Sequence, residues 1–406
     1  MPRRSKALFA FGAFAVVLVG LLYVVLVWDV FQNDSRELTT LSPKGPEAET
    51  IQILNIWVFG AAALVFVLVF GAAGYLMWRF RDREPEEEED FPEQVHGRTA
   101  LEIGWTIAPA VLLAAVAVAT VIAIIDLNDF SDDALKVKVE GQQWWWSFHY
   151  DLDNDGAFDG PNDLTTANEL VIPEDREVNL TITSNDVIHS FWIPALNGKK
   201  DAVPGMDTEW KLEASEPGVY RGQCTEFCGL SHANMRMLVR ALSLEDYERW
   251  LENQLRPANE PVAGSEAAAG KEQFSALCAQ CHIVRGQFED AAIEGPPLVS
   301  GVAPDLTHVA TRGTFAGSIF NLWSPELPTA SDPTGKADDT SLVGDPGDAL
   351  YGGVSQYYFN RPTLESWLRN PPAMKAMAPD GQRGMPNLGL SEDQIDQLVA
   401  YLESLK

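Results

Sequence analysis

A compact set of soft metal ligands lies in the run C-x-E-x-C-x3-H-x2-M from residue 224, with one more histidine in an upstream D-V-I-H-S-F motif. The side chains are His189, Cys224, Cys228, His232 and Met235. Sulfur and imidazole select copper, zinc or iron over magnesium or calcium. A structural zinc ion would leave Met235 without a role, and a disulfide would leave both histidines merely polar. Two copper ions sharing both thiolates would use the whole set, with Met235 and the Glu226 carbonyl as weak donors.

The other two cysteines belong to a C-x-x-C-H motif formed by Cys278, Cys281 and His282. This motif is the attachment signature of a c-type haem, which bonds to both thiols and takes the histidine as an iron ligand. A redox-active dithiol is the alternative interpretation. A second axial ligand would come from downstream, where a thioether suits electron transfer because it raises the reduction potential. The candidates are Met374, Met377 and Met385.

The first motif resembles the binuclear CuA site of the cytochrome c oxidase subunit II family. The resemblance implies copper ligation by the side chains of His189, Cys224, Cys228, His232 and Met235 and by the carbonyl of Glu226. It also implies a cupredoxin fold with the copper in loops at one end. The Glu226 carboxylate is implied to bind Mg²⁺ at the interface with subunit I.

The surroundings of the C-x-x-C-H motif resemble a class I cytochrome c. A helical lead-in precedes the motif, and Gly-Pro-Pro-Leu-Val-Ser-Gly follows it at 295–301. The resemblance implies that the carbonyl of Pro296 holds the ring of His282. It favours Met385 as the axial ligand, because Met-Pro precedes the last helix. The other two methionines are then packing or loop residues.

Together these parts resemble subunit II of a caa3-type oxidase, in which a cytochrome c follows the CuA domain. The resemblance implies electron transfer from an external donor to haem c, to CuA and then to haem a of subunit I, which reduces oxygen. No residue of this chain is then catalytic. The implied partners are subunits I and III and a cytochrome c, a cytochrome bc complex or another small redox donor. A CuA subunit of a nitric oxide reductase and a non-redox assembly or binding module are the alternatives.

Uncharged runs predict the membrane segments. As helices, 51–78 and 103–125 reach about 42 and 35 Å, which predicts a transmembrane hairpin within residues 45–130. A third run, 7–28, predicts an uncleaved anchor, with a cleaved signal as the alternative, within residues 1–30.

Charges beside these runs predict the topology. Arg79, Arg81 and Arg83 mark the inner side of the membrane. The chain after residue 126 is therefore expected outside a bacterial cell membrane, where copper loading and haem attachment belong. The acidic run 86–90 is expected to be a solvated hairpin on the inner side.

Two residues have candidate accessory roles. Glu102, at the start of a membrane helix, would complement the helix dipole. Its L-E-x-x-W-T motif resembles the family's step at the mouth of a proton pathway in the catalytic subunit. Trp144, in Q-W-W-W-S, resembles the family's exposed electron-entry residue. Packing of the adjacent tryptophans between the sheet and the membrane surface is the alternative.

The extracytoplasmic part is expected to hold two domains. Short alternating runs separated by turn residues predict an antiparallel β-sandwich over 131–252. A Pro/Ala/Glu-rich linker, 253–264, leads to an all-α cytochrome c domain over 265–406. Its last helix is predicted from a Ser/Gln capping box followed by an apolar face. These residues are Ser391, Gln394, Ile395, Leu398, Val399 and Leu402. A turn-rich surface insertion is expected at about 325–358.

The acidic residues Asp151, Asp153 and Asp155 precede a glycine in the pattern D-x-D-x-D-G-x-x-D. Carboxylates at alternate positions suit Ca²⁺. The closing position is Asn162 and no flanking helices are predicted, so a plain acidic hairpin loop is favoured. The net charge of −29 favours basic partners and excludes a nucleic-acid-binding role, although salt adaptation would give the same balance.

Overall fold

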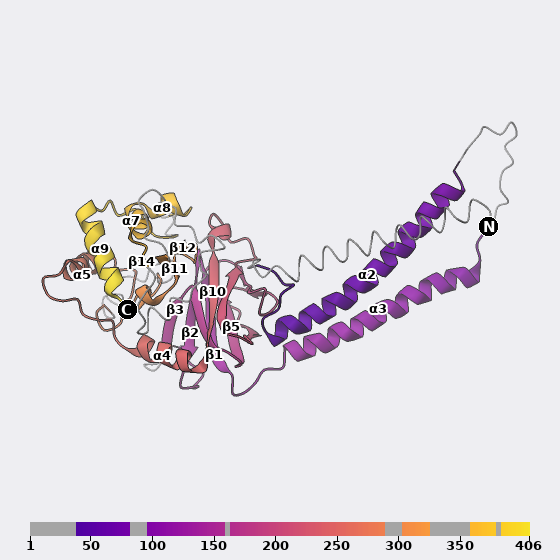
Figure 1. Ribbon diagram of the computed structural model, residues 1–406, viewed down its shortest axis with the longest axis horizontal. Coiled ribbons are helices and arrows are strands. Elements are labelled where there is room, and N and C mark those ends of the chain that lie inside the picture. Colours follow the sequence, from indigo (N-terminus) through magenta and orange to yellow (C-terminus); the bar gives the residue numbers. More distant parts are fainter. Residues whose placement is uncertain (1–37, 82–95, 159–162, 289–302, 325–357, 379–382) are drawn as a thin grey trace. The chain divides into compact units, whose positions relative to one another are not determined.

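The computed structural model describes residues 38–81, 96–158, 163–288, 303–324, 358–378 and 383–406 (Figure 1). The N-terminal apolar run, the acidic run 86–90, Pro296 and nearly all of the predicted insertion lie outside these ranges. The chain forms two compact units, one of helices and one that contains the chain from residue 130 on.

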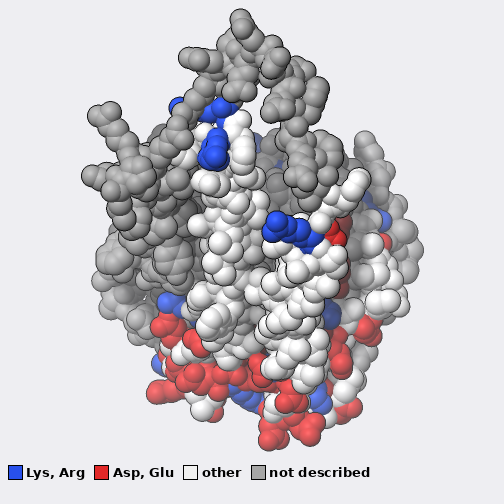
Figure 2. Space-filling view, turned by 90° about the vertical axis from the view of Figure 1, so that its right-hand side faces the viewer, with Lys and Arg blue, Asp and Glu red and all other residues white. Residues whose placement is uncertain are grey.

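Two long apolar helices dominate the first unit, α2 (Pro46–Arg79) and α3 (Thr99–Leu127). Large apolar side chains are exposed along both, and Figure 2 shows no charged side chains along their middle. A helix that is apolar on every face is stable where hydrocarbon surrounds it. Both helices are long and apolar enough to cross a bilayer. The two predicted helices are confirmed.

The β domain (residues 131–252) is built from two main sheets and a short ribbon. The larger sheet contains β1 (Leu135–Gln142), β2 (Trp145–Asp151), β3 (Leu164–Ala167), β5 (Val178–Ser184) and β8 (Thr208–Leu212). The smaller contains β4 (Glu169–Pro173), β9 (Gly218–Gln223) and β10 (Arg236–Leu242), and the ribbon contains β6 (His189–Phe191) and β7 (Lys200–Ala202). Their orders are β3-β2-β1-β5-β8 and β4-β10-β9.

Two strand pairs in this domain are parallel. β1 pairs in parallel with β5, and β4 pairs in parallel with β10, whereas the remaining pairs are antiparallel. The prediction of a purely antiparallel sandwich is therefore wrong for these pairs. The chain leaves the larger sheet at β4 and returns at β5, so β5 lies beside a strand that it does not follow directly.

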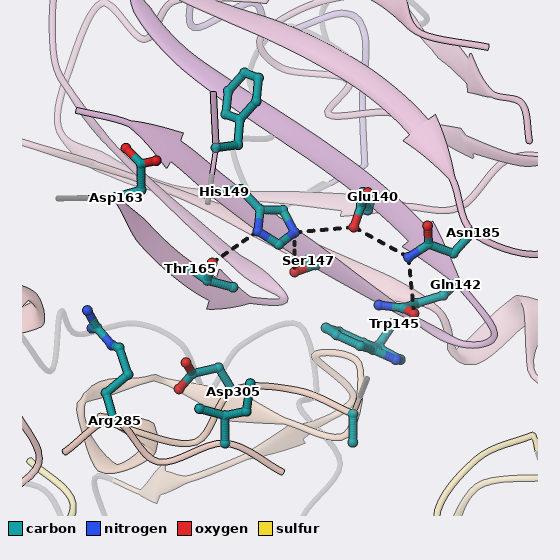
Figure 3. Close-up of a pocket in the computed structure, with 13 residues that line it drawn as sticks. Glu140, Gln142, Trp145, Ser147, His149, Asp163, Thr165, Asn185, Arg285 and Asp305 are labelled. Carbon is teal, nitrogen blue, oxygen red and sulfur yellow. Dashed lines mark hydrogen bonds and ion pairs between the residues drawn. The ribbon is translucent and has the colours of Figure 1, made fainter. Parts of the chain in front are cut away.

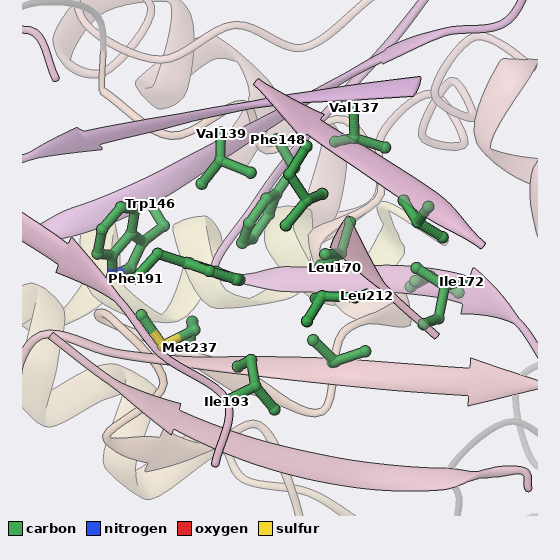
Figure 4. Packing of buried hydrophobic residues seen from close by; sticks show 14 of the residues in the cluster. Val137, Val139, Trp146, Phe148, Leu170, Ile172, Phe191, Ile193, Leu212 and Met237 are labelled. Atoms are coloured by element: carbon green, nitrogen blue, oxygen red, sulfur yellow. The ribbon is translucent and has the colours of Figure 1, made fainter. Parts of the chain in front are cut away.

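The core of the β domain lies between the two sheets (Figure 4). Val137 and Val139 point inward from β1, while Lys136 and Lys138, which alternate with them, are less buried, as a period of two requires. Leu170 and the other labelled residues of the smaller sheet close the core from the opposite side. Burial of each large apolar side chain stabilises the fold by roughly 1.5–3 kcal/mol. This core holds the strand ends that carry the metal ligands.

The C-terminal domain (residues 265–406) follows α4 (Leu244–Leu255) and the linker. Its described residues form the helices α5 (Glu266–Leu277), α7 (Arg361–Arg369), α8 (Pro371–Met374) and α9 (Glu392–Ser404). They also form short antiparallel strand pairs, β11 (Thr314–Phe315) with β12 (Phe320–Asn321) and β13 (Trp323–Ser324) with β14 (Tyr358–Phe359). An all-α domain was predicted, so these strand pairs are a correction. The capping box and buried face of α9 are confirmed.

Gly270 permits α5 to pack closely against α9. A Cβ atom at this position would overlap the backbone carbonyl of Gln397 and lie 2.8 Å from Cβ of Tyr401. We expect Gly270→Ala to lower the free energy of unfolding of this domain by about 1–3 kcal/mol, the usual cost of overpacking. Thermal unfolding of the full-length protein measures the loss. Ser275→Ala, at an exposed site on the same helix, is the control and should leave stability nearly unchanged.

Candidate metal centre

The two thiols and two imidazoles predicted to bind copper lie together. The sulfur atoms of Cys224 and Cys228 are 3.8 Å apart, far beyond the length of a disulfide, about 2.05 Å. Nδ1 of His189 lies 3.9 Å from Sγ of Cys224. Nδ1 of His232 lies 3.7 Å from Sγ of Cys228. Each thiol therefore faces its own imidazole, and the cysteines are free, which excludes the disulfide interpretation for this geometry.

Two weaker donors complete the set. Sδ of Met235 lies 3.8 Å from the sulfur of Cys228. The carbonyl oxygen of Glu226 lies 3.3 Å from the sulfur of Cys224. Both thiols and Met235 are buried, whereas the Glu226 side chain is exposed. Each thiol thus has one imidazole and one weak donor, which matches two metal ions better than one tetrahedral zinc ion.

Local structure fixes these positions. The ligand loop joins β9 to β10 and is closed by a hydrogen bond from the Cys224 N–H to the carbonyl of Met235, at 2.9 Å. His189 begins β6, and its Nε2 lies 2.9 Å from the Asp186 carboxylate, which turns Nδ1 toward the sulfur. Gly141 leaves room for the imidazole, because a Cβ there would lie 2.9 Å from the ring.

The thiol pair favours binding of cations. The S–H of Cys228 donates toward the Cys224 sulfur and, with His189, lowers the pKa of Cys224 to about 4. The same pairing raises the pKa of Cys228 well above its ordinary value, because a second thiolate would lie beside the first. Both sulfurs can carry charge together only where positive ions offset the repulsion. A metal supplies that positive charge.

Two adjacent residues brace the ligand loop from the turn between β1 and β2. Gln143 donates from Nε2 to the carbonyl of Cys228 at 2.6 Å, and Trp144 donates from Nε1 to the same oxygen at 3.0 Å. Trp144 is 5% exposed. The expectation of an exposed Trp144 is therefore wrong. Trp144 belongs to the core of the β domain, and Lys375 of the C-terminal domain bonds to its backbone carbonyl.

The C-x-x-C-H motif lies at the end of α5. The N–H groups of Cys281 and His282 donate to the carbonyl of Cys278, so one helical turn gathers the three residues. Burial raises the pKa of Cys278 to about 12 and also raises that of Cys281. A reactive dithiol has a lowered pKa instead. The raised pKa values therefore disfavour a redox-active dithiol.

The histidine of this motif has a different partner from the one predicted. Nδ1 of His282 hydrogen-bonds the carbonyl of Pro304 at 2.8 Å. Pro296, the predicted partner, lies outside the described residues, so the assignment moves to Pro304. The bond fixes the ring tautomer and leaves Nε2 available to an iron ion.

The three candidate methionines differ in their surroundings. Met377 packs against the core of the β domain, and its sulfur accepts the N–H of Met385 at 3.1 Å. Met374 and Met385 pack against the core of the C-terminal domain. These contacts disfavour Met377 as the axial ligand. The preference for Met385 over Met374 stays a prediction.

The acidic loop after β2 satisfies much of its own hydrogen bonding. Oxygens of Asp151, Asp153 and Asp155 lie within 4.8 Å of one another. The two carboxylate oxygens of Asp151 accept the N–H groups of Asp155 and Gly156 at 3.1 and 3.0 Å. These bonds account for a plain hairpin loop without an ion, the favoured interpretation.

A cavity of about 410 Å³ is lined by residues of the larger sheet and by Ile283, Arg285, Ala303 and Asp305 (Figure 3). His149 contacts Ser147 and Thr165 there, and its Nε2 lies 3.3 Å from the carboxylate of Glu140. The contact with His149 lowers the pKa of Glu140 to about 2. The network is internally paired and contains none of the metal donors.

Sequence patterns missed several residues that shape the centre, notably Pro304, Gln143 and Lys375. Asp186 lies three residues before His189 in the D-V-I-H-S-F motif, and this spacing could have predicted its contact with the histidine. Lys375 has no such signal, because 231 positions separate it from its partner Trp144.

Comparison with known proteins identifies the family. Residues 135–242 match the periplasmic domain of cytochrome c oxidase subunit II, and residues 37–122 match its transmembrane domain. Cytochrome c oxidase subunit 2 of Alkalihalophilus pseudofirmus is 33% identical over 381 residues, which cover 91% of this chain and 92% of that protein. The chain belongs to the cytochrome c oxidase subunit II family.

Two further relatives of this subunit II were found. Cytochrome c oxidase subunit 2 of Bacillus sp. strain PS3 is 29% identical, over 91% of this chain and 92% of its own. The periplasmic domain of subunit II of the Bradyrhizobium japonicum cytochrome oxidase is 29% identical, with a TM-score of 0.28. That similarity covers 31% of this chain and 95% of that one.

Membership of this family defines the general role of the chain. It is an electron-transfer component of a haem–copper oxidase, an oxidoreductase complex. Its two apolar helices and its CuA-type domain, with Cys and His candidates for the copper site, fit a membrane protein with an extracytoplasmic domain.

Proposed function

We propose that this chain is subunit II of a caa3-type oxidase, with a covalent haem c on the C-terminal domain and a binuclear CuA centre in the β domain. Electrons would pass from an external donor to the haem, to CuA and to haem a of subunit I. The observation that carries the proposal is the packing of a C-x-x-C-H domain directly on the CuA-type loop. Lys375 of that domain contacts Trp144, which is bonded to the carbonyl of Cys228.

The ligand loop suits a copper pair. His189, Cys224, Cys228, His232 and Met235 would bind through side chains, and Glu226 through its carbonyl. Two copper ions that share both thiolates would carry one electron with little change in geometry. Burial of the sulfurs excludes water, and Asp186 orients one imidazole.

The C-terminal domain suits a covalent haem. Cys278 and Cys281 would bond to it, His282 and Met385 would be its axial ligands, and Pro304 fixes the histidine ring. The two relatives that align over 91% of this chain extend across most of this domain, so it belongs to their shared length.

The other side of the copper loop would face subunit I. Phe227 and Leu230 are 77% and 65% exposed, and the Glu226 carboxylate is exposed beside them. Apolar side chains that are exposed on a loop whose metal ligands are buried are typical of a protein interface. We place the expected Mg²⁺ at Glu226 in that interface. Subunit III would also belong to the assembly.

We place the chain in a bacterial inner membrane, with both redox domains on the extracytoplasmic side. Arg79 ends α2 at the expected inner side. The net charge of −29 suits a basic donor, such as a cytochrome c, over long range. A cytochrome bc complex or another small redox protein would serve the same step.

Glu102 is proposed to lie at the entry of a proton pathway. It is exposed in the first turn of α3, and a Cβ at Gly97 would collide with its carboxylate. We expect Glu102→Gln to slow oxidase turnover several-fold while copper and haem spectra stay unchanged, because it removes an ionisable group and leaves both domains intact. Thr106→Val, one turn further on the same helix, is the control. Unchanged turnover would leave Glu102 with only the role of complementing the helix dipole.

One experiment tests the proposal as a whole. The complex is purified from membranes, and its copper per haem c and its catalytic subunit are determined. Two copper ions per covalent haem and an oxygen-reducing subunit I are expected. A nitric oxide reductase as the co-purifying partner would favour the alternative CuA role. Absence of both copper and haem would favour the non-redox module.

A further inference from the structure

The C-terminal domain inserts a buried lysine into the β domain. Lys375 is 4% exposed, and its Nζ donates to the carbonyl of Trp144 at 2.7 Å and to that of Ala316 at 2.9 Å. Burial lowers the pKa of Lys375 to about 7. A neutral amine retains two N–H donors, so both bonds can form in either protonation state.

The β domain inserts a buried glutamate in the opposite direction. Glu169, at the start of β4, is 2% exposed. Its carboxylate accepts the N–H and hydroxyl of Thr314 at 2.7 and 2.8 Å and the N–H of Gly313 at 3.2 Å. Arg240, on β10, lies 3.9 Å from the same carboxylate. Hydrogen bonds to an ionised carboxylate are about twice as strong as neutral ones.

The loop between β11 and β12 lies between these two anchors. Ala316, Gly317 and Ser318 all have positive φ angles, 57°, 80° and 56°. The carbonyl of Gly317 accepts the N–H of Arg236 at 3.1 Å, one residue after Met235. Positive φ angles at two non-glycine residues so close together persist only where surrounding contacts hold them. The loop is therefore shaped by its contact with the β domain.

We propose that Lys375 and Glu169 form a reciprocal clamp that keeps the C-terminal domain docked over Trp144 and closes this face of the metal centre to separate donor proteins. The covalent linker adds to the clamp, because a short tether supplies an effective concentration of about millimolar. External donors then have access only to the C-terminal domain. That last consequence rests on the proposed function, whereas the clamp itself requires no cofactor.

Amide hydrogen exchange in the full-length protein in detergent tests the clamp. Peptides that contain Gly313, Thr314 and Arg236 report it, because these N–H groups donate across the interface. In the wild type they should exchange far more slowly than the exposed linker residues 262–264. Lys375→Met removes both donors, and we expect it to speed exchange at these reporters by about tenfold or more.

Two further variants, Lys271→Met and Glu169→Gln, and one reporter in the β-domain core serve as comparisons. Lys271→Met removes a more exposed lysine of the same domain, bonded to Glu260, and should leave the reporters unchanged. Exchange at Val139, in the β-domain core, shows whether Lys375→Met unfolds the β domain. If it does, Glu169→Gln provides the decisive comparison, and the same acceleration is expected at Gly313 and Thr314.

The proposal is overturned if the wild-type reporters exchange as fast as the linker. It is equally overturned if neither variant speeds exchange while Val139 stays protected. Copper and haem content, measured on the same samples, separates this outcome from failure of the proposed function. A chain without cofactors but with protected reporters would retain the clamp and lose the electron-transfer role.

Discussion

Replacing Cys224 with serine is expected to abolish the copper centre and nearly all electron delivery to the catalytic subunit. The sulfur of Cys224 lies between His189, Cys228 and the Glu226 carbonyl. A serine hydroxyl does not ionise at neutral pH and cannot bridge two ions as a thiolate does. Loss of an outer-shell partner alone costs about 10- to 100-fold in metal affinity or activity, so loss of a bridging ligand should cost at least that much.

Copper per chain and the thiolate–copper absorption bands of the membrane complex measure this effect. Met235→Leu provides a graded comparison and should keep copper with an altered spectrum, because the thioether is a weak donor. Ala233→Ser, at an exposed site on the same loop, is the control for loop damage. Wild-type copper content in the serine variant would contradict the assignment. One zinc ion per wild-type chain would favour a structural zinc site.

Replacing both Cys278 and Cys281 with serine is expected to remove the covalent haem and leave copper bound. Both thiols are required for attachment, and they lie far in sequence from the copper loop. Reduction of copper by an external protein donor should fall close to background, because the C-terminal domain is bonded to the backbone of Trp144 and of Arg236 beside the copper loop. A small chemical reductant should still reduce the copper. Haem staining after denaturation and the rate of copper reduction are the measurements.

Methionine variants refine this prediction. Met385→Leu should keep covalent haem but change its axial-ligand spectrum, because it removes the proposed thioether ligand. Met377→Leu should change neither, since Met377 packs against the β domain. A wild-type chain with no covalent haem would contradict haem attachment. An altered spectrum in the Met377 variant alone would move the axial ligand to that residue.

The grouping of the proposed copper ligands could be predicted because most of them belong to one loop. Cys224, Cys228, His232 and Met235 lie within one connection between β9 and β10, so their spacing already restricts their geometry. His189 was found by its motif, and Asp186 orients it. The transmembrane helices and α9 were predictable for the same reason, since apolar runs and a capping box are local features.

Other features depend on contacts between distant segments. The parallel pairing of β1 with β5 follows from the path of the chain between the sheets, which alternation within a strand does not reveal. The partner of His282 was predicted at a family position, but Pro304 reaches the ring. The N–H of a histidine ring donates to whichever carbonyl the folded loop brings close.

The sequence by itself determined the two sulfur motifs of this protein, the metals that suit their ligand types, and the membrane helices. The spacing of residues along the chain is sufficient to predict the sulfur motifs, because a few consecutive bonds hold their metal-donor atoms near one another. The tertiary structure decided which faces of the metal centre are accessible. Trp144 is buried in the β-domain core, and Lys375, 231 positions away, bonds to its carbonyl. Burial depends on the packing of whole domains, which no short pattern encodes.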